Sequence, residues 1–239
     1  FLMIRRPPRS TQIARRQRQM CIRDRIKKIH SVISEKSLLK HPFYEAWNCG
    51  ELPIESMRKY AEQYYHFEKA YPRFLSNVHS RCDDRNVRQL LLENLWDEEH
   101  GEDNHVELWL RFCDALGLDR AQVENSTPDN STKELIDSFL DLTSNHSLAG
   151  GASALFAFES QVPEVADTKI AGLKNFYGIE DSRGISFFKV HRDLDIEHSD
   201  AEAEMINSLA TTEREENDAV DSADIAASSL WNFLDGVYK

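Results

Sequence analysis

The spacing of apolar residues constrains the fold most strongly. From Ile26 onward they recur every three to four positions almost everywhere, as on the buried face of a helix. No stretch alternates apolar and polar side chains over the length of a strand, and no unit is repeated along the chain. Since helices bury their apolar stripes against one another, the sequence predicts an all-α fold: one bundle of about seven or eight helices over residues 26–239.

Turn and capping residues divide this pattern into the expected helices. A long helix is expected from Ile54 to Arg81, kinked at Pro72, which has no N–H to donate. A second is expected to run unbroken from the caps Asp83-Asp84 to Leu116-Gly117. The others are expected near residues 26–39, 152–160, 164–176 and 182–209, and after the capping-box patterns Ser131-Thr132-Lys133-Glu134 and Thr212-Glu213-Arg214-Glu215.

Charge is distributed unevenly. Residues 1–25 hold eight arginines and one acid, Asp24, so they carry +7, and with −12 overall the remainder carries −19. An acidic body repels phosphates, which argues against a nucleic-acid partner. The basic segment alone could suggest RNA binding or a transit peptide, but Pro7-Pro8 and the single serine Ser10 disfavour the latter. Its runs also resemble a translated sequencing adapter. We therefore expect residues 1–25 to be a non-native or disordered arm.

Composition narrows the class further. The longest apolar stretch, Leu148–Phe158, is too short to span a bilayer and contains glycines, so no membrane segment is expected. The four cysteines are scattered without a C-x-x-C pair, which argues against a disulfide framework and a zinc finger. A reducing, cytoplasmic setting fits this cysteine usage.

Three metal-capable side chains share one stripe of the helix expected over residues 182–209. At about 100° per residue, Asp195 lies roughly 40° from His191, and His198 lies roughly 20° from it on the other side. The apolar residues just before them suggest a buried entry to this helix. The alternative is a chance triplet on a solvated face.

Glu98 and His105 are seven residues apart, so a single unbroken helix would place them on one stripe. Leu108 and Trp109 flank this stripe, which suggests that it faces inward. Glu102 would share it and is a rival ligand. The alternative is a surface acid beside a core histidine.

Glu159 ends the apolar run Ala154–Phe158, where a carboxylate is costly to bury unless it is paired or bound to metal. Alternatively, it lies at a helix end and reaches solvent. Together the three groups supply three imidazoles and three carboxylates and no thiolate, a set suited to iron or manganese rather than structural zinc. Because carboxylates can bridge, the set predicts a two-metal site on inward helix faces. The Glu-x-x-His marker of ferritin-like bundles is missing from these groups, so a different helical scaffold is implied.

Many short runs between residues 37 and 200 carry a family resemblance. They include His41-Pro42-Phe43-Tyr44, Gly50-Glu51-Leu52, Tyr60-Ala61, Tyr64-Tyr65, His79-Ser80-Arg81-Cys82, Asp97-Glu98-Glu99, Asn104-His105, Leu108-Trp109, Glu159-Ser160-Gln161-Val162-Pro163, Lys169-Ile170 and the His191/Asp195/His198 triplet. The sequence resembles the haem-oxygenase-like di-metal oxidases, and most nearly the folate-related family of the chlamydial protein associating with death domains. Phe158 departs from the family pattern, which has a tyrosine there, so a redox role at that position is in doubt.

The resemblance implies a haem-oxygenase-like bundle and a self-sacrificing 4-aminobenzoate synthase. An Fe/Fe or Fe/Mn pair, held by Glu98, His105, Glu159, His191, Asp195 and His198, would activate O2 with an external reductant. By position, Tyr44 would be the tyrosine that is consumed, and Lys169 would donate the amino group. Tyr60 and Tyr64 would relay oxidising equivalents.

Other interpretations stay open at this point. Tyr60, Tyr64 and Tyr65 also suit an ordinary aromatic core, and Lys169 suits a helix surface. The protein could be a di-iron oxygenase with a small-molecule substrate, or a metal-free relative of thiaminase-like or pyrroloquinoline-quinone-forming enzymes. A protein-interaction module is a third class, although no sequence feature supports a death-domain partner. The oligomeric state is also open, and a homodimer is one option.

Overall fold

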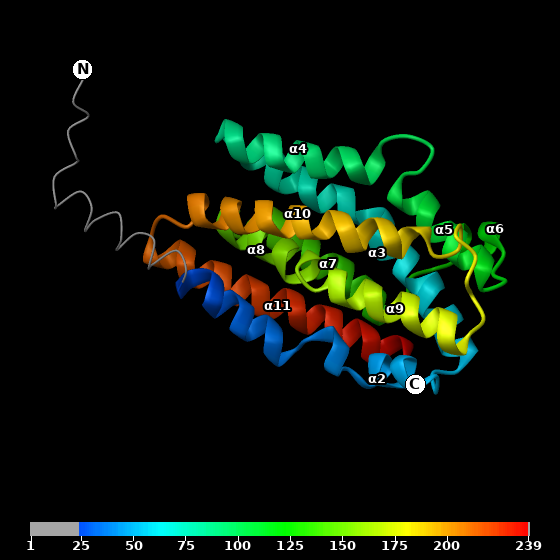
Figure 1. Cartoon of the computed structure of the whole chain (residues 1–239). Helices are drawn as coiled ribbons and strands as arrows, with labels where there is room; N and C mark the ends of the chain where they lie inside the picture. Colours follow the sequence, from blue (N-terminus) through cyan, green and yellow to red (C-terminus); the bar gives the residue numbers. More distant parts are fainter. Residues whose placement is uncertain (1–23, 239) are drawn as a thin grey trace, which may run out of the picture.

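The computed structural model describes residues 24–238, in which all regular secondary structure is helical (Figure 1). A helical stretch over residues 24–35 is followed by the 3-10 turn η1 (Leu38–Lys40), α2 (Pro42–Cys49), α3 (Ile54–Arg81), α4 (Arg85–Glu99), α5 (His105–Ala115), α6 (Arg120–Asn125), α7 (Asn130–Asn145), α8 (Leu148–Glu159), α9 (Val162–Phe176), α10 (Ser186–Leu209) and α11 (Glu213–Val237). The all-α prediction is confirmed. The predicted number of helices was too low, because ten α-helices from α2 to α11 lie within the described residues.

The region between Asp84 and Leu116 accounts for part of this difference. The predicted single helix is wrong: α4 ends at Glu99 and α5 begins at His105. Gly101 lies between them with φ +85°, a backbone conformation that glycine adopts without strain. The side chain of Asn104 then caps α5 by accepting a hydrogen bond from the backbone N–H of Glu107. Glu102 is exposed in this connection, away from any shared helical stripe.

Caps define the other boundaries. The capping box of Thr212 and Glu215 at the start of α11 is confirmed. At α7 the predicted cap is wrong, because the side chain of Asp129, rather than that of Ser131, accepts the hydrogen bond from the Thr132 N–H. The short helix α6 was not predicted.

The five helices that carry the candidate site, α3, α4, α5, α8 and α10, pack against one another. α10 packs against both α8 and α9, α8 also packs against α11, and α3 packs against α4, α5 and α7 (Figure 1). α3 continues through Pro72, which cannot donate a hydrogen bond to the carbonyl oxygen of Glu68 one turn earlier. The end of α11 reaches α2, where the ring of Tyr238 lies 6.0 Å from that of Phe43.

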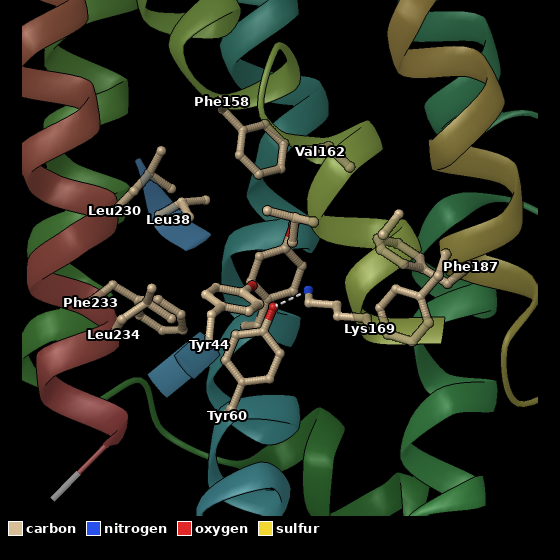
Figure 2. Close-up of a pocket in the computed structure, with 14 residues that line it drawn as sticks. Leu38, Tyr44, Tyr60, Phe158, Val162, Lys169, Phe187, Leu230, Phe233 and Leu234 are labelled. Carbon is tan, nitrogen blue, oxygen red and sulfur yellow. Dashed lines mark hydrogen bonds between the residues drawn. The ribbon is translucent and has the colours of Figure 1, made fainter. Parts of the chain in front are cut away.

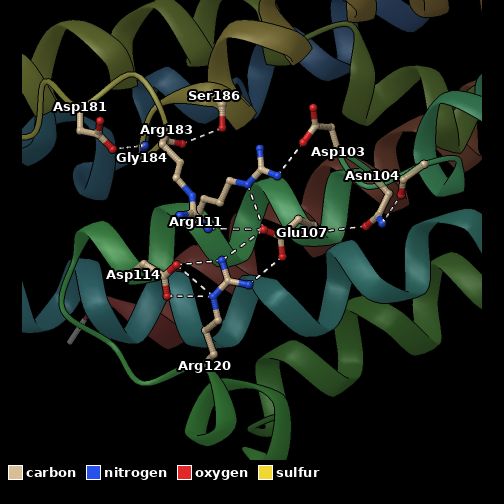
Figure 3. Close-up of polar contacts among 11 residues, drawn as sticks. Asp103, Asn104, Glu107, Arg111, Asp114, Arg120, Asp181, Arg183, Gly184 and Ser186 are labelled. Atoms are coloured by element: carbon tan, nitrogen blue, oxygen red, sulfur yellow. Dashed lines mark hydrogen bonds and ion pairs between the residues drawn. The ribbon is translucent and has the colours of Figure 1, made fainter.

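An ion-pair network on the surface ties α5 to its neighbours (Figure 3). The Glu107 carboxylate of α5 lies 2.7 Å from the guanidinium of Arg120 in α6 and 2.9 Å from that of Arg111. Arg183, in the segment leading into α10, lies 3.8 Å from the same carboxylate. The network therefore links the helix that begins with His105 to the helix that carries His191.

The described part of the chain begins inside the first helical stretch. Arg25 is buried there, and its guanidinium pairs with the Glu216 carboxylate of α11. The predicted end of the basic arm at residue 25 is therefore wrong, because residues 24 and 25 belong to the folded helix. Residues 1–23 lie outside the described residues, and for them the arm stays a prediction. Over residues 24–238, no helix combines the length and the apolar character needed to cross a membrane.

Candidate metal centre

Ionisable side chains gather in the core where α3, α4, α5, α8 and α10 meet. Every one of the six ligands predicted from the sequence is buried there: Glu98, His105, Glu159, His191, Asp195 and His198. Charged groups are seldom buried unless they are paired or coordinate a metal. The solvent-facing alternatives for Glu159 and for the α10 triplet are therefore wrong.

The tightest cluster joins α3, α5 and α10. Glu68, His105 and His191 each place one potential ligand atom within 4.8 Å of the other two. Glu98 adjoins this cluster, with its Oε2 2.8 Å from His105 Nδ1. The structure therefore brings Glu98 and His105 together across a break between helices.

A second group lies further along α10. His198 Nδ1 is 3.8 Å from Glu159 Oε2 and 3.6 Å from Asp195 Oδ1. Glu159 is held in place because its carboxylate accepts hydrogen bonds from the Tyr71 hydroxyl, at 2.5 Å, and from the Asn94 amide, at 2.9 Å.

Two histidines are oriented by groups outside the clusters. His191 Nδ1 lies 2.9 Å from the Phe187 carbonyl oxygen, which leaves Nε2 directed toward Glu68. His198 Nε2 lies 3.2 Å from Asp97 Oδ2, which leaves Nδ1 directed toward Glu159 and Asp195. A partner that takes one ring nitrogen in this way fixes the ring and frees the other nitrogen for a metal.

Burial changes the pKa values of these carboxyl and imidazole groups. Burial raises the pKa of Glu68 well above its usual value and that of Asp195 to about 8, although His105 beside Glu68 and His198 beside Asp195 offset part of each rise. Burial lowers the pKa of His191. Burial also acts to lower the pKa of His105, but the adjacent Glu98 carboxylate outweighs it and raises that pKa to about 9.

Glu68 Oε1 and Asp195 Oδ2 have no hydrogen-bond partner among the described residues. A mixed carboxylate–imidazole set with free oxygens fits divalent iron or manganese.

Glu68 was not among the metal ligands predicted from the sequence. It follows Tyr60 and Tyr64 at four-residue intervals on α3, so the three side chains share one helical stripe. That spacing was the sequence signal for an inward-facing Glu68. In the sequence alone, however, such an acid resembles an ordinary helix-surface residue, and only the structure shows that Glu68 is buried, at 2% exposed.

Next to the cluster lies a small aromatic chamber of about 30 Å³ (Figure 2). Its wall includes Tyr44, Tyr60, Tyr64 and Lys169. Lys169 is 5% exposed, so the helix-surface interpretation of this residue is wrong. Its Nζ donates a hydrogen bond to the Tyr60 hydroxyl at 2.6 Å and lies 5.7 Å from the centre of the Tyr44 ring. Burial lowers the pKa of Lys169 to about 7, so a large share of this amine is neutral near neutral pH.

The local structure of α2 presents Tyr44 to this chamber. His41 caps the helix by accepting a hydrogen bond from the Phe43 N–H at 3.0 Å, and Pro42 begins it. Against α9, a Cβ at Gly172 would meet the Trp47 indole at 2.5 Å, so only glycine permits this close approach. α2 and α9 can therefore bring Tyr44 near Lys169.

A continuous line of side chains connects Tyr44 to the cluster. The Tyr60 hydroxyl faces Tyr44; burial raises the pKa of Tyr44, and the hydrogen bond with Tyr60 offsets part of that rise. The rings of Tyr60 and Tyr64 are 5.5 Å apart. Burial also raises the pKa of Glu68, which the hydrogen bond from Tyr64 partly offsets. Phe158, in contrast, offers no phenol and packs its ring 5.1 Å from that of Tyr71.

The fold and this centre place the chain in a known class. A family described as iron-containing redox enzymes matches residues 58–231, and the chain belongs to this family. The haem-oxygenase-like fold is shared with the crystal structure of a TenA homolog from Pseudomonas syringae, which is 15% identical and has a TM-score of 0.77 over 90% of this chain and 91% of that one.

More similar relatives narrow the family. A 4-aminobenzoate synthase from Nitrosomonas europaea is 41% identical over 220 residues, covering 88% of this chain and 89% of the relative. One from Chlamydia muridarum is 39% identical, covering 87% of each. The resemblance to the family of the chlamydial protein is thereby confirmed.

Proposed function

We propose that this protein uses a pair of metal ions to activate O2 and forms 4-aminobenzoate from its own Tyr44. The observation that carries the proposal is the unbroken line Tyr44, Tyr60, Tyr64, Glu68, which runs from a buried phenol to a buried carboxylate–histidine cluster. The relatives named 4-aminobenzoate synthase support it.

The ligands divide into two sets in this proposal. Glu68, Glu98, His105 and His191 would hold one metal, and Glu159, Asp195 and His198 the other. Glu68 is added to the set predicted from the sequence. An Fe/Fe or Fe/Mn pair suits these nitrogen and oxygen donors. When bound, the pair supplies oxidising equivalents from O2, and an external reductant supplies the electrons that the reaction consumes.

The size of the chamber favours an internal substrate. A volume of about 30 Å³ holds one or two water-sized molecules, whereas a cavity that accepts benzene measures about 150 Å³. A second aromatic ring therefore has no room beside Tyr44. O2 is small enough to enter, and the apolar walls keep bulk water from an oxidised phenol.

Tyr60, Tyr64 and Lys169 have separate roles in this proposal. Tyr60 and Tyr64 carry the oxidation from the metal pair to Tyr44, because their rings bridge the intervening space. Lys169 would donate the amino group, since its neutral amine lies beside both Tyr44 and Tyr60. Its nitrogen would condense with the oxidised ring carbon and release the phenol oxygen as water, and hydrolysis of the resulting imine would break the Cε–N bond and leave Lys169 as an aldehyde. The ring of Tyr44 would leave with its Cβ, oxidised to the carboxylate carbon, after the Cα–Cβ bond breaks.

Isotope labelling tests the origin of the product. Protein made with ring-labelled tyrosine, then given Fe²⁺, a reductant and O2, should release labelled 4-aminobenzoate. Unlabelled protein supplied with free labelled tyrosine should release only unlabelled product. Label that enters from the free amino acid, or many turnovers on any added compound, would replace this proposal with an oxygenase acting on a small-molecule substrate.

A further inference from the structure

We propose that Glu202 is an additional carboxylate ligand of the metal assigned to Glu159, Asp195 and His198. This inference rests on the proposed two-metal function. Glu202 lies on α10 four residues after His198 and seven after Asp195, so the three side chains point from one stripe of that helix. It extends the stripe by one turn, at the end furthest from His191.

Burial makes Glu202 difficult to explain as a structural residue. Its side chain is 0% exposed, and no hydrogen-bond donor among the described residues reaches either carboxylate oxygen. A buried carboxylate without a partner destabilises a folded protein, because the water it loses is not replaced. If Glu202 had no function, an apolar side chain of similar size at this position would make the folded protein more stable.

The neighbours of Glu202 add to the uncompensated negative charge around its buried carboxylate. Burial raises the pKa of Glu202, and the negative charges of the Glu159 and Asp195 carboxylates raise it further. Tyr71 and Asn94 already direct their hydrogen bonds to Glu159, so they leave Glu202 unsatisfied. A cation among Glu159, Asp195 and Glu202 would compensate all three carboxylates together.

Adding Glu202 gives the two sets different chemistry. The set with Glu68 and Glu98 contains two imidazoles and two carboxylates, whereas the set with Glu202 contains one imidazole and three carboxylates. Oxygen-rich sets suit hard ions such as Mn²⁺ better than imidazole-rich sets do. Mn²⁺ alone is therefore a suitable probe for the Glu202 set.

The test measures Mn²⁺ binding to the metal-free full-length protein by equilibrium dialysis and electron paramagnetic resonance, without O2 turnover. The wild type should bind two ions. Glu202→Gln should keep one and bind the second at least tenfold more weakly, while Glu202→Asp, which retains a shorter carboxylate, should fall between them. Glu204→Gln, an exposed acid on the same helix, is the control and should match the wild type. The melting temperature of metal-free Glu202→Gln should equal or exceed that of the wild type, which also verifies that the variant folds.

Two results would overturn the proposal, and they are distinguishable. If the wild type binds two ions and Glu202→Gln binds both with unchanged affinity, Glu202 only positions Glu159, since the Gln amide can still donate to that carboxylate. In that case the two-metal function stands. If the wild type itself binds fewer than two ions, the Glu202 assignment and the proposed two-metal function both fail.

Discussion

At the residue scale, burial among aromatic rings changes the charge of Lys169. Aromatic rings surround its ammonium group, and the centres of the Tyr60 and Phe188 rings lie 4.8 and 5.1 Å from Nζ. The faces of these rings attract a cation, but they replace water only in part. The pKa of Lys169 therefore falls to about 7.

This shift predicts a dependence of stability on pH. Between about pH 7 and the usual lysine value of 10.5, the unfolded chain binds a proton at Lys169 that the folded chain has lost. The free energy of unfolding of the wild type, relative to Lys169→Met, should therefore rise with pH across this window. Denaturant titrations of both proteins at pH 7 and pH 10 measure the difference. An equal pH dependence for the two would show that Lys169 remains charged in the fold.

Ligand substitutions give a second prediction at this scale. Asp195→Ala or His191→Ala should abolish binding of at least one of two metals, because each removes a donor from a shared stripe of α10, while the helical content stays the same. Asp193→Ala, an exposed acid on the same helix, is the matched control. Metal analysis of anaerobically loaded protein, with circular dichroism, makes the comparison. Full two-metal occupancy in both ligand variants would remove these residues from the centre.

At the scale of elements, the α4–α5 connection matters most, because it places Glu98 and His105 within contact. At Gly101, φ is +85° and no heavy atom lies within 4 Å of an added Cβ, so Gly101→Ala should cost only backbone strain, about 1–2 kcal/mol. Gly178→Ala, at φ +67° and equally open, should cost a similar amount. Only the change at Gly101 should also weaken metal binding. Equal metal affinities in the two variants would show that the connection does not position the ligands.

The same connection shows how far sequence reasoning reaches. His191, Asp195 and His198 lie on one helix, so their common direction follows from helical geometry, and the structure places all three in the core. Glu98 and His105 were paired for an incorrect reason, since the unbroken helix does not exist and they meet across Gly101. Glu68 and Glu202 share helical stripes with residues that were selected, but many solvated acids show the same spacing, and packing between helices decides which acids are buried.

At the scale of the whole molecule, the described residues form the bundle from residue 24 onward, and Arg25 is joined to α11. Deleting residues 1–23 should leave the melting temperature and metal content unchanged, because an arginine-rich segment with Pro7-Pro8 offers little apolar surface to bury. Thermal unfolding and metal analysis of the truncated protein test this. A clear fall in either would make the segment part of the folded protein.

The central claim is that the protein consumes its own Tyr44. Its most direct test loads the full chain with Fe²⁺, with and without Mn²⁺, adds reductant and limited O2, and follows the tryptic peptide of residues 41–58 by mass spectrometry beside the released 4-aminobenzoate. We predict that the peptide loses the Tyr44 side chain in proportion to the product, with less than one equivalent formed per chain. Tyr44→Phe should retain metal and release no product, whereas Tyr65→Phe should behave as the wild type. Product that forms while this peptide stays intact, or that exceeds one equivalent, would contradict the account.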